Sequence, residues 1–589
     1  MTKSSTFAGI GMILMYVILS VGIFQSLDED AFISFRYVDQ LVEGNGLVFN
    51  QESKVEGFSN FLWIVILYPF KALGCSLIII SRVLGMLFGL GSAFMVVRFT
   101  KKLMPEDRIL PWAVGYWYVL SIPVIWWSQG GMETTLIAFE ILAMTYFMAF
   151  GNKSWLWGGV WLVLSAMTRP EAHLFIPLYF FWIITKKRNE GAIKGITLVL
   201  VTLGVYHLLR YSYYGYLLPT PAAMKVTGSF ALGFDYLWSF FIHGHYFWAI
   251  PFFLRAVFSW EQRSATLPLE TVVLAYLFFI LYAGGDYKPH FRFMVPFLAP
   301  FMILSALGLH MMARLFGSKG KKLLTYFVTC LLILLPLLFY KGRENRFILI
   351  KGLYQWVDHT KKQVSTYTTN YDYSYHPYLG QWIKKKFPST TLITYEQMGQ
   401  VPYFAGIDYH FIDLGGLMDR YIADCYKKAR PPSLCTFFSQ ILDHVTLGKA
   451  RGMVNKFKSL CPHGEPDMIQ EIVRYVLSKQ SEVVMVTGFI SQWYPWKYLW
   501  NDPSFRNNYI LTQIFGYSPG AYRENIGDFD LETLNTIIFF RKDFNLADPL
   551  KKKCRFSDVS HSLFYHYTEQ DEVKEWLKKK YPDLLALTH

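Results

Sequence analysis

The sequence is poor in charge, and it lacks the glycine-rich motifs of nucleotide-binding proteins. Charged residues make up 17% of the 589 positions, whereas hydrophobic residues make up 53%. A soluble protein of this length carries more charge and shorter apolar runs, so the composition excludes an ordinary soluble enzyme. Neither a GxGxxG nor a P-loop pattern occurs, which excludes these two kinds of nucleotide site.

Cysteine is also scarce, with six residues in the chain and no CxxC pair. This spacing gives no support for a zinc site. Four cysteines lie in the last third, and if that part is exported, one or two disulfides can form with a connectivity that the sequence leaves open. These cysteines are Cys425, Cys435, Cys461 and Cys554.

The formal net charge of +14 does not indicate a nucleic-acid partner, because no basic stripe with interleaved aromatic residues occurs. Much of the excess in the first half lies in short Lys/Arg loops, which orient membrane helices. The N-terminus has Lys3 and an apolar run without a small-residue cleavage site. We expect an uncleaved signal anchor whose amino end is cytoplasmic.

Apolar runs recur through the first 340 residues. A spanning helix needs about 20 apolar residues, and the runs predict an α-helical polytopic membrane protein with about eleven transmembrane helices. Residues 61–70 are apolar but short, and they predict a re-entrant or interfacial helix. The expected spans are residues 7–24, 78–99, 110–127, 134–150, 155–167, 174–185, 196–211, 236–258, 267–283, 293–316 and 323–339.

The composition changes near residue 341, where polar residues begin to dominate. Short β-type runs at 391–395, 483–487, 509–514 and 536–540 alternate with amphipathic stretches such as 467–477. We therefore predict a transmembrane module at 1–340, with a first outer loop at 26–60, and a soluble α/β domain at 341–589. This domain follows an outward span, so we expect it to be extracytoplasmic.

Polar motifs that contain glycine or proline fall on the face opposite to the Lys/Arg clusters. They occupy residues 28–37, 130–134, 168–171, 218–227 and 284–293. Nucleotide sugars do not reach an outer membrane face, so group transfer there requires a donor carried by the membrane, such as a sugar on a polyprenyl phosphate. The transfer needs a carboxylate base, cations for the leaving phosphate and an apolar groove for the prenyl chain.

Three carboxylates follow the first span, where acidic groups close to hydrocarbon are costly and indicate function. Asp28, Glu29 and Asp30 are therefore candidate general bases, and Asp28 is more typical of an exposed loop charge. The alternative role for Asp30 is to cap the start of a helix.

Four basic side chains are candidates for the donor phosphate: Arg36, Lys225, His290 and Arg292. Arg36 has the alternative of pairing with a carboxylate, and Lys225 that of a solvated loop lysine. Asp286 is expected to orient the residues beside it.

A second group, Glu133, Arg169 and Glu171, is expected to contact or orient the acceptor. Glu133 begins a span, where an acid also complements the helix dipole, and Arg169 with Glu171 could form a purely structural ion pair. We expect no obligatory metal, because a monophosphate donor requires one less than a pyrophosphate does. The many carboxylates leave a divalent cation open.

Several of these motifs resemble the GT-C glycosyltransferases, and among them the terminal β-(1→2) arabinofuranosyltransferase family of the mycobacterial cell wall. The similar segments are residues 30–37, 44–50 and 55–63 of the first outer loop, then 131–134, 168–171, 218–228 and 284–293, and in the C-terminal part 396–403 and 413–420. The order of the segments is also that of the family. Two departures are Glu29 before Asp30, where the family has a second Asp, and residues 220–224 before Lys225, where the family has Asn-Thr-Phe-Tyr-Ala. The resemblance places the general base in the first outer loop, with Asp30 as the first choice and Glu29 as the second.

The resemblance implies an inverting glycosyltransferase of the bacterial inner (plasma) membrane. Its partners would be a polyprenyl-phosphate sugar donor and a cell-envelope glycan or lipid-linked saccharide acceptor, within membrane lipid and without nucleic acid. The donor sugar would be arabinofuranose. The rival interpretation is a lipid or saccharide transporter or flippase, which predicts charges at mid-membrane depth and broken helices paired in two halves. A non-catalytic scaffold is a third.

Overall fold

The structure is a computed structural model. It describes residues 3–23, 27–51, 53–151, 153–185, 189–221, 230–286, 288–340, 376–428, 468–487, 502–517, 535–543 and 564–566. Up to residue 340 the described part is helical. Its elements are α1 (Lys3–Val17), η1 (Ile18–Ile23), α2 (Glu29–Val42), α3 (Phe61–Ala72), α4 (Leu77–Leu103), α5 (Leu110–Val119), α6 (Ile122–Gln129), α7 (Thr134–Phe150), α8 (Ser154–Thr168), η2 (Pro170–Leu174), α9 (Phe175–Thr185), α10 (Asn189–Tyr214), α12 (Phe230–His243), η3 (Phe247–Ala249), α13 (Ile250–Val257), α14 (Arg263–Ala283), η4 (Pro289–Met294), α15 (Val295–Ala313) and α16 (Ser318–Phe339).

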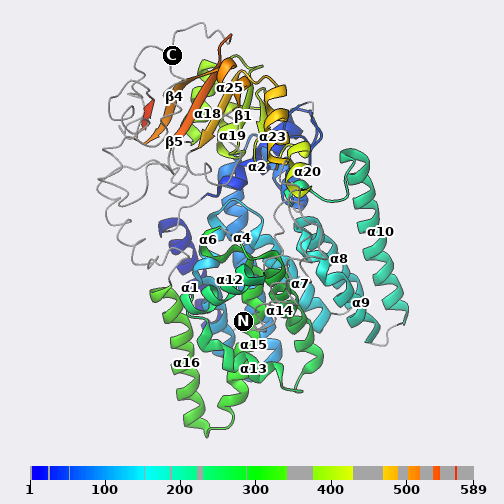
Figure 1. Ribbon diagram of the computed structural model, residues 1–589. Coiled ribbons are helices and arrows are strands. Elements are labelled where there is room, and N and C mark those ends of the chain that lie inside the picture. Colours follow the sequence, from blue (N-terminus) through cyan, green and yellow to red (C-terminus); the bar gives the residue numbers. More distant parts are fainter. Residues whose placement is uncertain are drawn as a thin grey trace, which may run out of the picture.

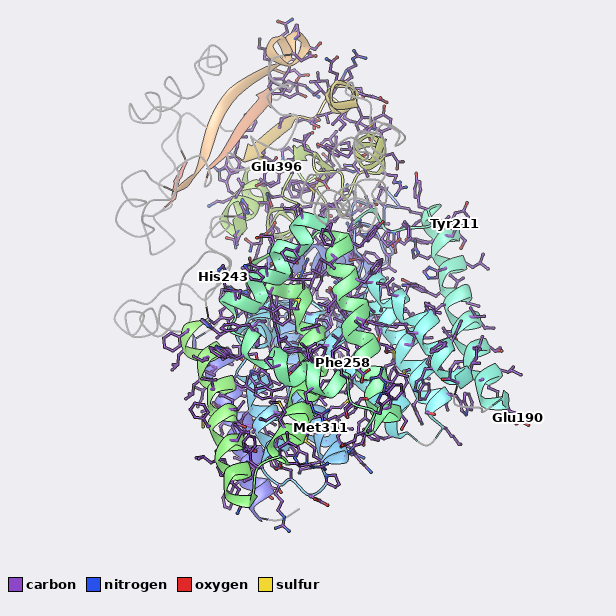
Figure 2. The ribbon with its side chains drawn as sticks, turned by 60° about the horizontal axis from the view of Figure 1, so that its bottom comes forward. Glu190, Tyr211, His243, Phe258, Met311 and Glu396 are labelled. Carbon is purple, nitrogen blue, oxygen red and sulfur yellow. The ribbon has the colours of Figure 1, made fainter. Side chains whose placement is uncertain are left out.

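Five stretches of the described helices are long and apolar enough to cross a membrane: Leu77–Leu103, Glu190–Tyr214, Arg263–Ala283, Pro289–Ala313 and Lys322–Phe339. The fourth stretch, Pro289–Ala313, lies inside the bundle, since 94% of its most apolar part is buried. Helices α10 and α16 lie at the edges of the bundle (Figure 1), and Figure 2 shows α10 there between Glu190 and Tyr211. These helices support a membrane-embedded protein, with fewer full-length spans than the eleven expected.

Two of the expected spans are broken into shorter helices. The run at 110–127 divides into α5 and α6 at Ser121, whose backbone is extended, and Pro123 lies in the first turn of α6. The run at 236–258 divides into α12 and α13, and a proline again lies in the first turn of the second helix. Proline cannot continue a preceding helix because it lacks an N–H and clashes with the preceding turn. The apolar pattern alone did not reveal these breaks.

The described C-terminal part contains a mixed six-stranded sheet of order β2-β1-β3-β5-β4-β6. β1 is parallel to β2 and β3, and the remaining pairs are antiparallel. The four predicted strands and the predicted helix at 467–477 are confirmed, whereas β2 and β6 were missed. The elements are α18 (His376–Lys386), β1 (Leu392–Tyr395), α19 (Gln400–Ala405), β2 (His410–Asp413), α20 (Arg420–Lys428), α23 (Met468–Ser478), β3 (Val483–Thr487), α25 (Pro503–Asn508), β4 (Tyr509–Tyr517), β5 (Asn535–Arg541) and β6 (Phe564–His566).

Helix α2 lies between the helical bundle and the sheet (Figure 1). Its Arg36 side chain is fully buried. Nε donates to the carbonyl oxygen of Phe49 at 3.0 Å, and Nη1 to those of Pro402 at 2.6 Å and Gly406 at 2.7 Å. Nη2 donates to the carbonyl oxygen of Tyr409 at 2.7 Å. One guanidinium therefore fastens three carbonyls of the C-terminal part to α2. The predicted boundary at 340/341 stays a prediction, because residues 341–375 lie outside the described residues.

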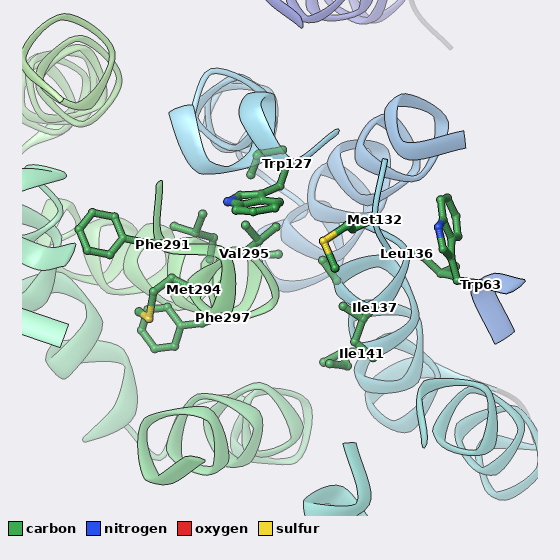
Figure 3. Close-up of a cluster of buried hydrophobic side chains, with 14 of the residues drawn as sticks. Trp63, Trp127, Met132, Leu136, Ile137, Ile141, Phe291, Met294, Val295 and Phe297 are labelled. Carbon is green, nitrogen blue, oxygen red and sulfur yellow. The ribbon is translucent and has the colours of Figure 1, made fainter. Parts of the chain in front are cut away.

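Buried apolar side chains surround the motif residues of the bundle. Figure 3 shows Trp127 and Val295 on one side, and Met132 and Leu136 on the other. All four belong to the main hydrophobic cluster. Close packing of such side chains restricts the backbone segments that carry them. The hydrophobic cluster therefore fixes the positions of the motif segments.

Replacing Arg36 by alanine should destabilise the protein by about 3 kcal/mol or more, because it removes the side chain that donates to three carbonyls of the C-terminal part and leaves these buried acceptors without it. Thermal unfolding of the full chain in detergent measures the change. Arg314→Ala is the matched control, since Arg314 is exposed and pairs with Glu261 at 3.4 Å, a contact that contributes less than about 1 kcal/mol. Equal losses in the two variants would contradict the assigned role of Arg36.

Candidate functional site

The site begins where α2 begins. Asp28 is the N-cap of α2, and its carboxylate accepts the backbone N–H of Asp30 at 2.9 Å. Its own backbone N–H donates to the carbonyl oxygen of Gly130 at 3.0 Å. Asp28 is buried, with 3% of its surface exposed, so the expectation of an exposed loop charge is wrong. The capping role considered for Asp30 belongs to Asp28, which leaves the Asp30 carboxylate available for other contacts.

The loop between α14 and α15 brings two cations to these carboxylates. Lys288 Nζ lies 2.8 Å from Asp28 Oδ1 and 3.3 Å from Asp30 Oδ1. Arg292 Nε lies 2.7 Å from Asp286 Oδ2, and its Nη1 lies 3.9 Å from Asp30 Oδ2. The structure thus brings Asp30 together with Asp286 and Arg292, which belong to a distant motif of the sequence, and adds Lys288.

The contacts in this cluster are unequal. Each cation has one close partner, Asp28 for Lys288 and Asp286 for Arg292, while both contacts of Asp30 are longer. The Asp30 side chain is 15% exposed, against 2% for Asp28 and 4% for Asp286. Asp28 and Asp286 therefore hold the two cations closely, and Asp30 is the most exposed of the three carboxylates.

The backbone of the cation-bearing loop is strained. Gly284 and Gly285 have φ values of 82° and 79°, and His290 and Phe291 have φ values of 55° and 52°. Left-handed backbone is uncommon for residues other than glycine and persists where the surroundings impose it. Arg292 follows this unusual path directly, within η4 and shortly before α15 begins at Val295.

A second polar cluster lies beside the first. Glu133 Oε1 pairs with Arg169 Nη1 at 2.8 Å, and Glu133 Oε2 accepts from Asn60 Nδ2 at 2.7 Å. Arg169 Nε pairs with Glu171 Oε1 at 2.8 Å. Asn60 Nδ2 also donates to Ser34 Oγ at 3.0 Å. The three residues expected to contact the acceptor therefore lie together, and Asn60 joins them to α2.

The two clusters form one continuous site. Ser34 follows Asp30 by four positions on α2, so both side chains lie on the same face of the helix. The ring of Phe293 lies 5.5 Å from Arg169 Cζ and 5.3 Å from Arg292 Cζ. The two guanidinium groups thus contact one aromatic ring, which connects the carboxylates of α2 with Glu133 and its partners.

Two of the predicted phosphate contacts, Arg36 and His290, do not join this site. Arg36 is buried among backbone carbonyls, so the structure contradicts both the phosphate contact and the carboxylate pair expected for it. The ring of His290 packs against Trp126, with centroids 4.0 Å apart, and within the described residues it forms no ion pair with the site carboxylates. Lys225 lies outside the described residues.

Glu29 faces the C-terminal part. Its Oε1 accepts the backbone N–H groups of Gly399 at 3.0 Å and Gln400 at 2.9 Å. Burial raises the pKa of Glu29 to about 8, although these hydrogen bonds and the charge of Lys288 act in the opposite direction. The second-choice base thus connects α2 to the C-terminal part, one residue away from Asp30.

Sequence reasoning missed two residues of the site, Lys288 and Asn60. Lys288 lies between Asp286 and Arg292 in the sequence, within a motif that was recognised. Its position between two candidate site residues could have marked it as a third. Asn60 belongs to a segment quoted only for its family resemblance. Other expectations fall outside the described residues, including Cys435, Cys461 and Cys554. Among the described residues, no group of three or more His, Cys, Asp or Glu side chains is arranged to hold a metal ion.

The stability of the protein should depend on pH through Glu29. Its folded pKa of about 8 lies above the ordinary value of 4.5, so the folded state binds more protons between these values and stability falls as the pH rises through this range. Glu29→Gln keeps an acceptor oxygen for Gly399 and Gln400 but does not titrate. Between pH 5 and pH 8, melting curves should show a smaller fall in Tm for Glu29→Gln than for wild type.

Glu261→Gln provides the control for this measurement, since Glu261 is exposed and its ion pair with Arg314 is long. Its pH dependence should follow that of wild type. Parallel curves for wild type and Glu29→Gln would show that Glu29 is already ionised in the folded protein.

Comparison with known proteins adds three findings. Residues 362–528 match a family model described as a domain of unknown function (DUF8728). The ArnT structures from Cupriavidus metallidurans, bound to undecaprenyl phosphate and in the apo state, are each 11% identical, with TM-scores of 0.46 and 0.44. The first alignment covers 71% of this chain and 89% of that chain, and the second covers 68% and 84%. At these TM-scores the likeness does not establish a shared fold.

A terminal β-(1→2)-arabinofuranosyltransferase of Corynebacterium glutamicum is 23% identical over 349 residues. The match covers 49% of this chain and 49% of that protein, so the chain spans about half the length of this curated relative. The resemblance to the terminal arabinofuranosyltransferases that the motifs indicated is thus found again by a sequence match over about half of the chain.

Proposed function

We propose that this chain is a GT-C glycosyltransferase that moves a sugar from a polyprenyl phosphate to a cell-envelope glycan or glycolipid, with inversion at the anomeric carbon. The observation that carries the proposal is the accessible Asp30 carboxylate between Lys288 and Arg292. A base and two phosphate-binding cations are what this transfer requires. The name of the Corynebacterium relative supports arabinofuranose as the sugar.

Asp30 is the general base in this proposal. It is the most exposed of the three carboxylates at the start of α2, and Asp28 already caps the helix. As the acceptor hydroxyl attacks, its proton passes to Asp30, and a bond forms between the acceptor oxygen and the anomeric carbon. The bond between the anomeric carbon and the phosphate oxygen breaks, and its electron pair leaves with the polyprenyl phosphate.

Lys288 and Arg292 receive this phosphate by exchanging partners. Asp28 lies close to Lys288, and Asp286 lies close to Arg292. Asp30 contacts both cations at longer distances, and these are the contacts that the phosphate is proposed to replace. The cluster contains three carboxylates and two cations, so it gains one unit of positive charge when Asp30 takes up a proton. Proton transfer thereby strengthens the hold on the phosphate as its negative charge grows. Lys225 stays a predicted additional phosphate contact.

The cluster of Glu133, Arg169 and Glu171 is proposed to orient the acceptor. Asn60 connects Glu133 to α2, on the face that carries Asp30. Buried and mutually paired polar groups of this kind keep a fixed geometry, which is needed to place a hydroxyl beside the base.

The prenyl chain is proposed to lie along the apolar helices that flank the site. Helix α3 exposes Val65, Tyr68 and Leu73, the last with 80% of its surface exposed. We place the protein in the bacterial inner membrane, with the C-terminal part on the extracytoplasmic side. The rival transporter interpretation lacks a specific observation in its favour, since the described site charges cluster near helix ends and loops at one end of the bundle.

Asp30→Asn should lower transfer from a polyprenyl-phosphate arabinofuranose donor by about 10²–10⁴-fold, the range that general-base catalysis supplies, while the protein still folds and inserts. Radiolabelled donor and an envelope-glycan extract provide the assay. Asp39→Asn is the matched control, because Asp39 lies on the same helix and pairs with Lys71 at 2.9 Å, away from the cluster. Transfer that survives in both Asp30→Asn and Glu29→Gln would refute the assignment of the base.

If wild type transfers no sugar from any of a panel of donors, the transporter interpretation is favoured.

Transfer should not depend on a divalent cation. Lys288 Nζ lies within 3.3 Å of both Asp28 and Asp30, the position from which a metal would otherwise neutralise two carboxylates. A chelator such as EDTA should therefore leave the rate unchanged, whereas Lys288→Gln should lower it. Loss of activity with EDTA, restored by added Mg²⁺ or Mn²⁺, would contradict this role for Lys288.

A further inference from the structure

Arg82 on α4 is a cation without an assigned role. Its Nε is buried and has no hydrogen-bond partner among the described residues. The buried arginines Arg36, Arg210 and Arg292 differ from the partly buried Arg82, since each of them donates to a named acceptor. A charged group inside a membrane helix is costly and indicates a functional contact.

The position of Arg82 places it between the lipid-facing surface and the proposed transfer site. It is the sixth residue of α4, about 8 Å along the helix from its start, near the end where the α2 carboxylates lie. The preceding residue, Ser81, is fully buried, and both it and Ala31 of α2 lie next to Gly131. The neighbours Ile79 and Val83 are 62% and 45% exposed.

This setting suits an anion at the level of the lipid head groups. An arginine close to a helix end can extend its guanidinium toward the interface while its stem stays in the apolar layer. The planar guanidinium binds phosphate oxygens in pairs. Lipid phosphates are the abundant anions at this depth, and they reach a lipid-facing side chain by lateral diffusion.

We propose that Arg82 binds the phosphate group of a membrane lipid in the leaflet next to the α2 carboxylates. The membrane setting is taken from the proposed function. The ligand chemistry is a phosphate ester with an apolar tail, supplied either by a polyprenyl phosphate on its way to Lys288 and Arg292 or by an anionic phospholipid that borders the entrance.

Native mass spectrometry of the full chain in detergent tests this binding without any sugar transfer. The probes are a polyprenyl phosphate without sugar and phosphatidylglycerol, each added separately. Arg82→Ala should lower the bound fraction of one or both probes about tenfold, the effect of losing one charge-assisted hydrogen bond, and Arg82→Lys should restore part of it. Arg98→Ala is the control, because Arg98 lies on the same helix and donates to Tyr146 Oη at 2.7 Å.

A loss restricted to the polyprenyl phosphate supports a donor entry site, and a loss of both probes or of phosphatidylglycerol alone supports a general lipid-phosphate site. Unchanged binding of both probes in Arg82→Ala would overturn the proposal, as would an equal loss in Arg98→Ala. The Tm of Arg82→Ala should equal or exceed that of wild type in detergent, which separates lost binding from misfolding. Because the readout is lipid binding, it can fail while the transferase assignment holds, and the reverse is also true.

Discussion

The ion pair between Asp28 and Lys288 is the constraint on which the site depends. Both side chains are buried, and a buried charge that loses its partner destabilises a protein strongly. Asp28 also caps α2, so one carboxylate fixes the start of the helix and the position of the lysine. Arg292 is fixed in the same way by Asp286. With both cations held in this way, the proposed transfer replaces their contacts with Asp30 by contacts with the lipid phosphate.

The C-terminal part contributes to the same helix. Glu29 accepts two of its backbone N–H groups, and Arg36 donates to three of its carbonyls. Asp30 therefore lies on a helix whose first turn is joined to the bundle on one side and to the C-terminal part on the other. This arrangement gives the C-terminal part a direct structural influence on the position of the base, because α2 cannot shift without breaking buried hydrogen bonds.

Local patterns predicted much of this architecture. Alternation and apolar runs located four strands and most of the helices, and the motifs in order located Asp30, Arg292 and Glu133. The rest depends on contacts between distant segments. Lys288 is 260 positions from Asp28, and Arg36 is 366 positions from Pro402. No short-range sequence pattern relates residues this far apart. The sequence around Lys288 and around Arg36 therefore did not indicate which residues they contact. The breaks in the two expected spans were missed because each proline lies within a long apolar run, and the run was interpreted as one continuous helix.

In the proposed transfer, a lipid phosphate displaces Asp30 from Lys288 and Arg292. An experimental structure of the full chain with a bound polyprenyl phosphate tests it most directly. We expect phosphate oxygens within hydrogen-bond distance of both cations, with Asp28 still paired to Lys288, Asp286 still paired to Arg292, and Asp30 released from both. A phosphate bound elsewhere, with the contacts of Asp30 unchanged, would contradict the account.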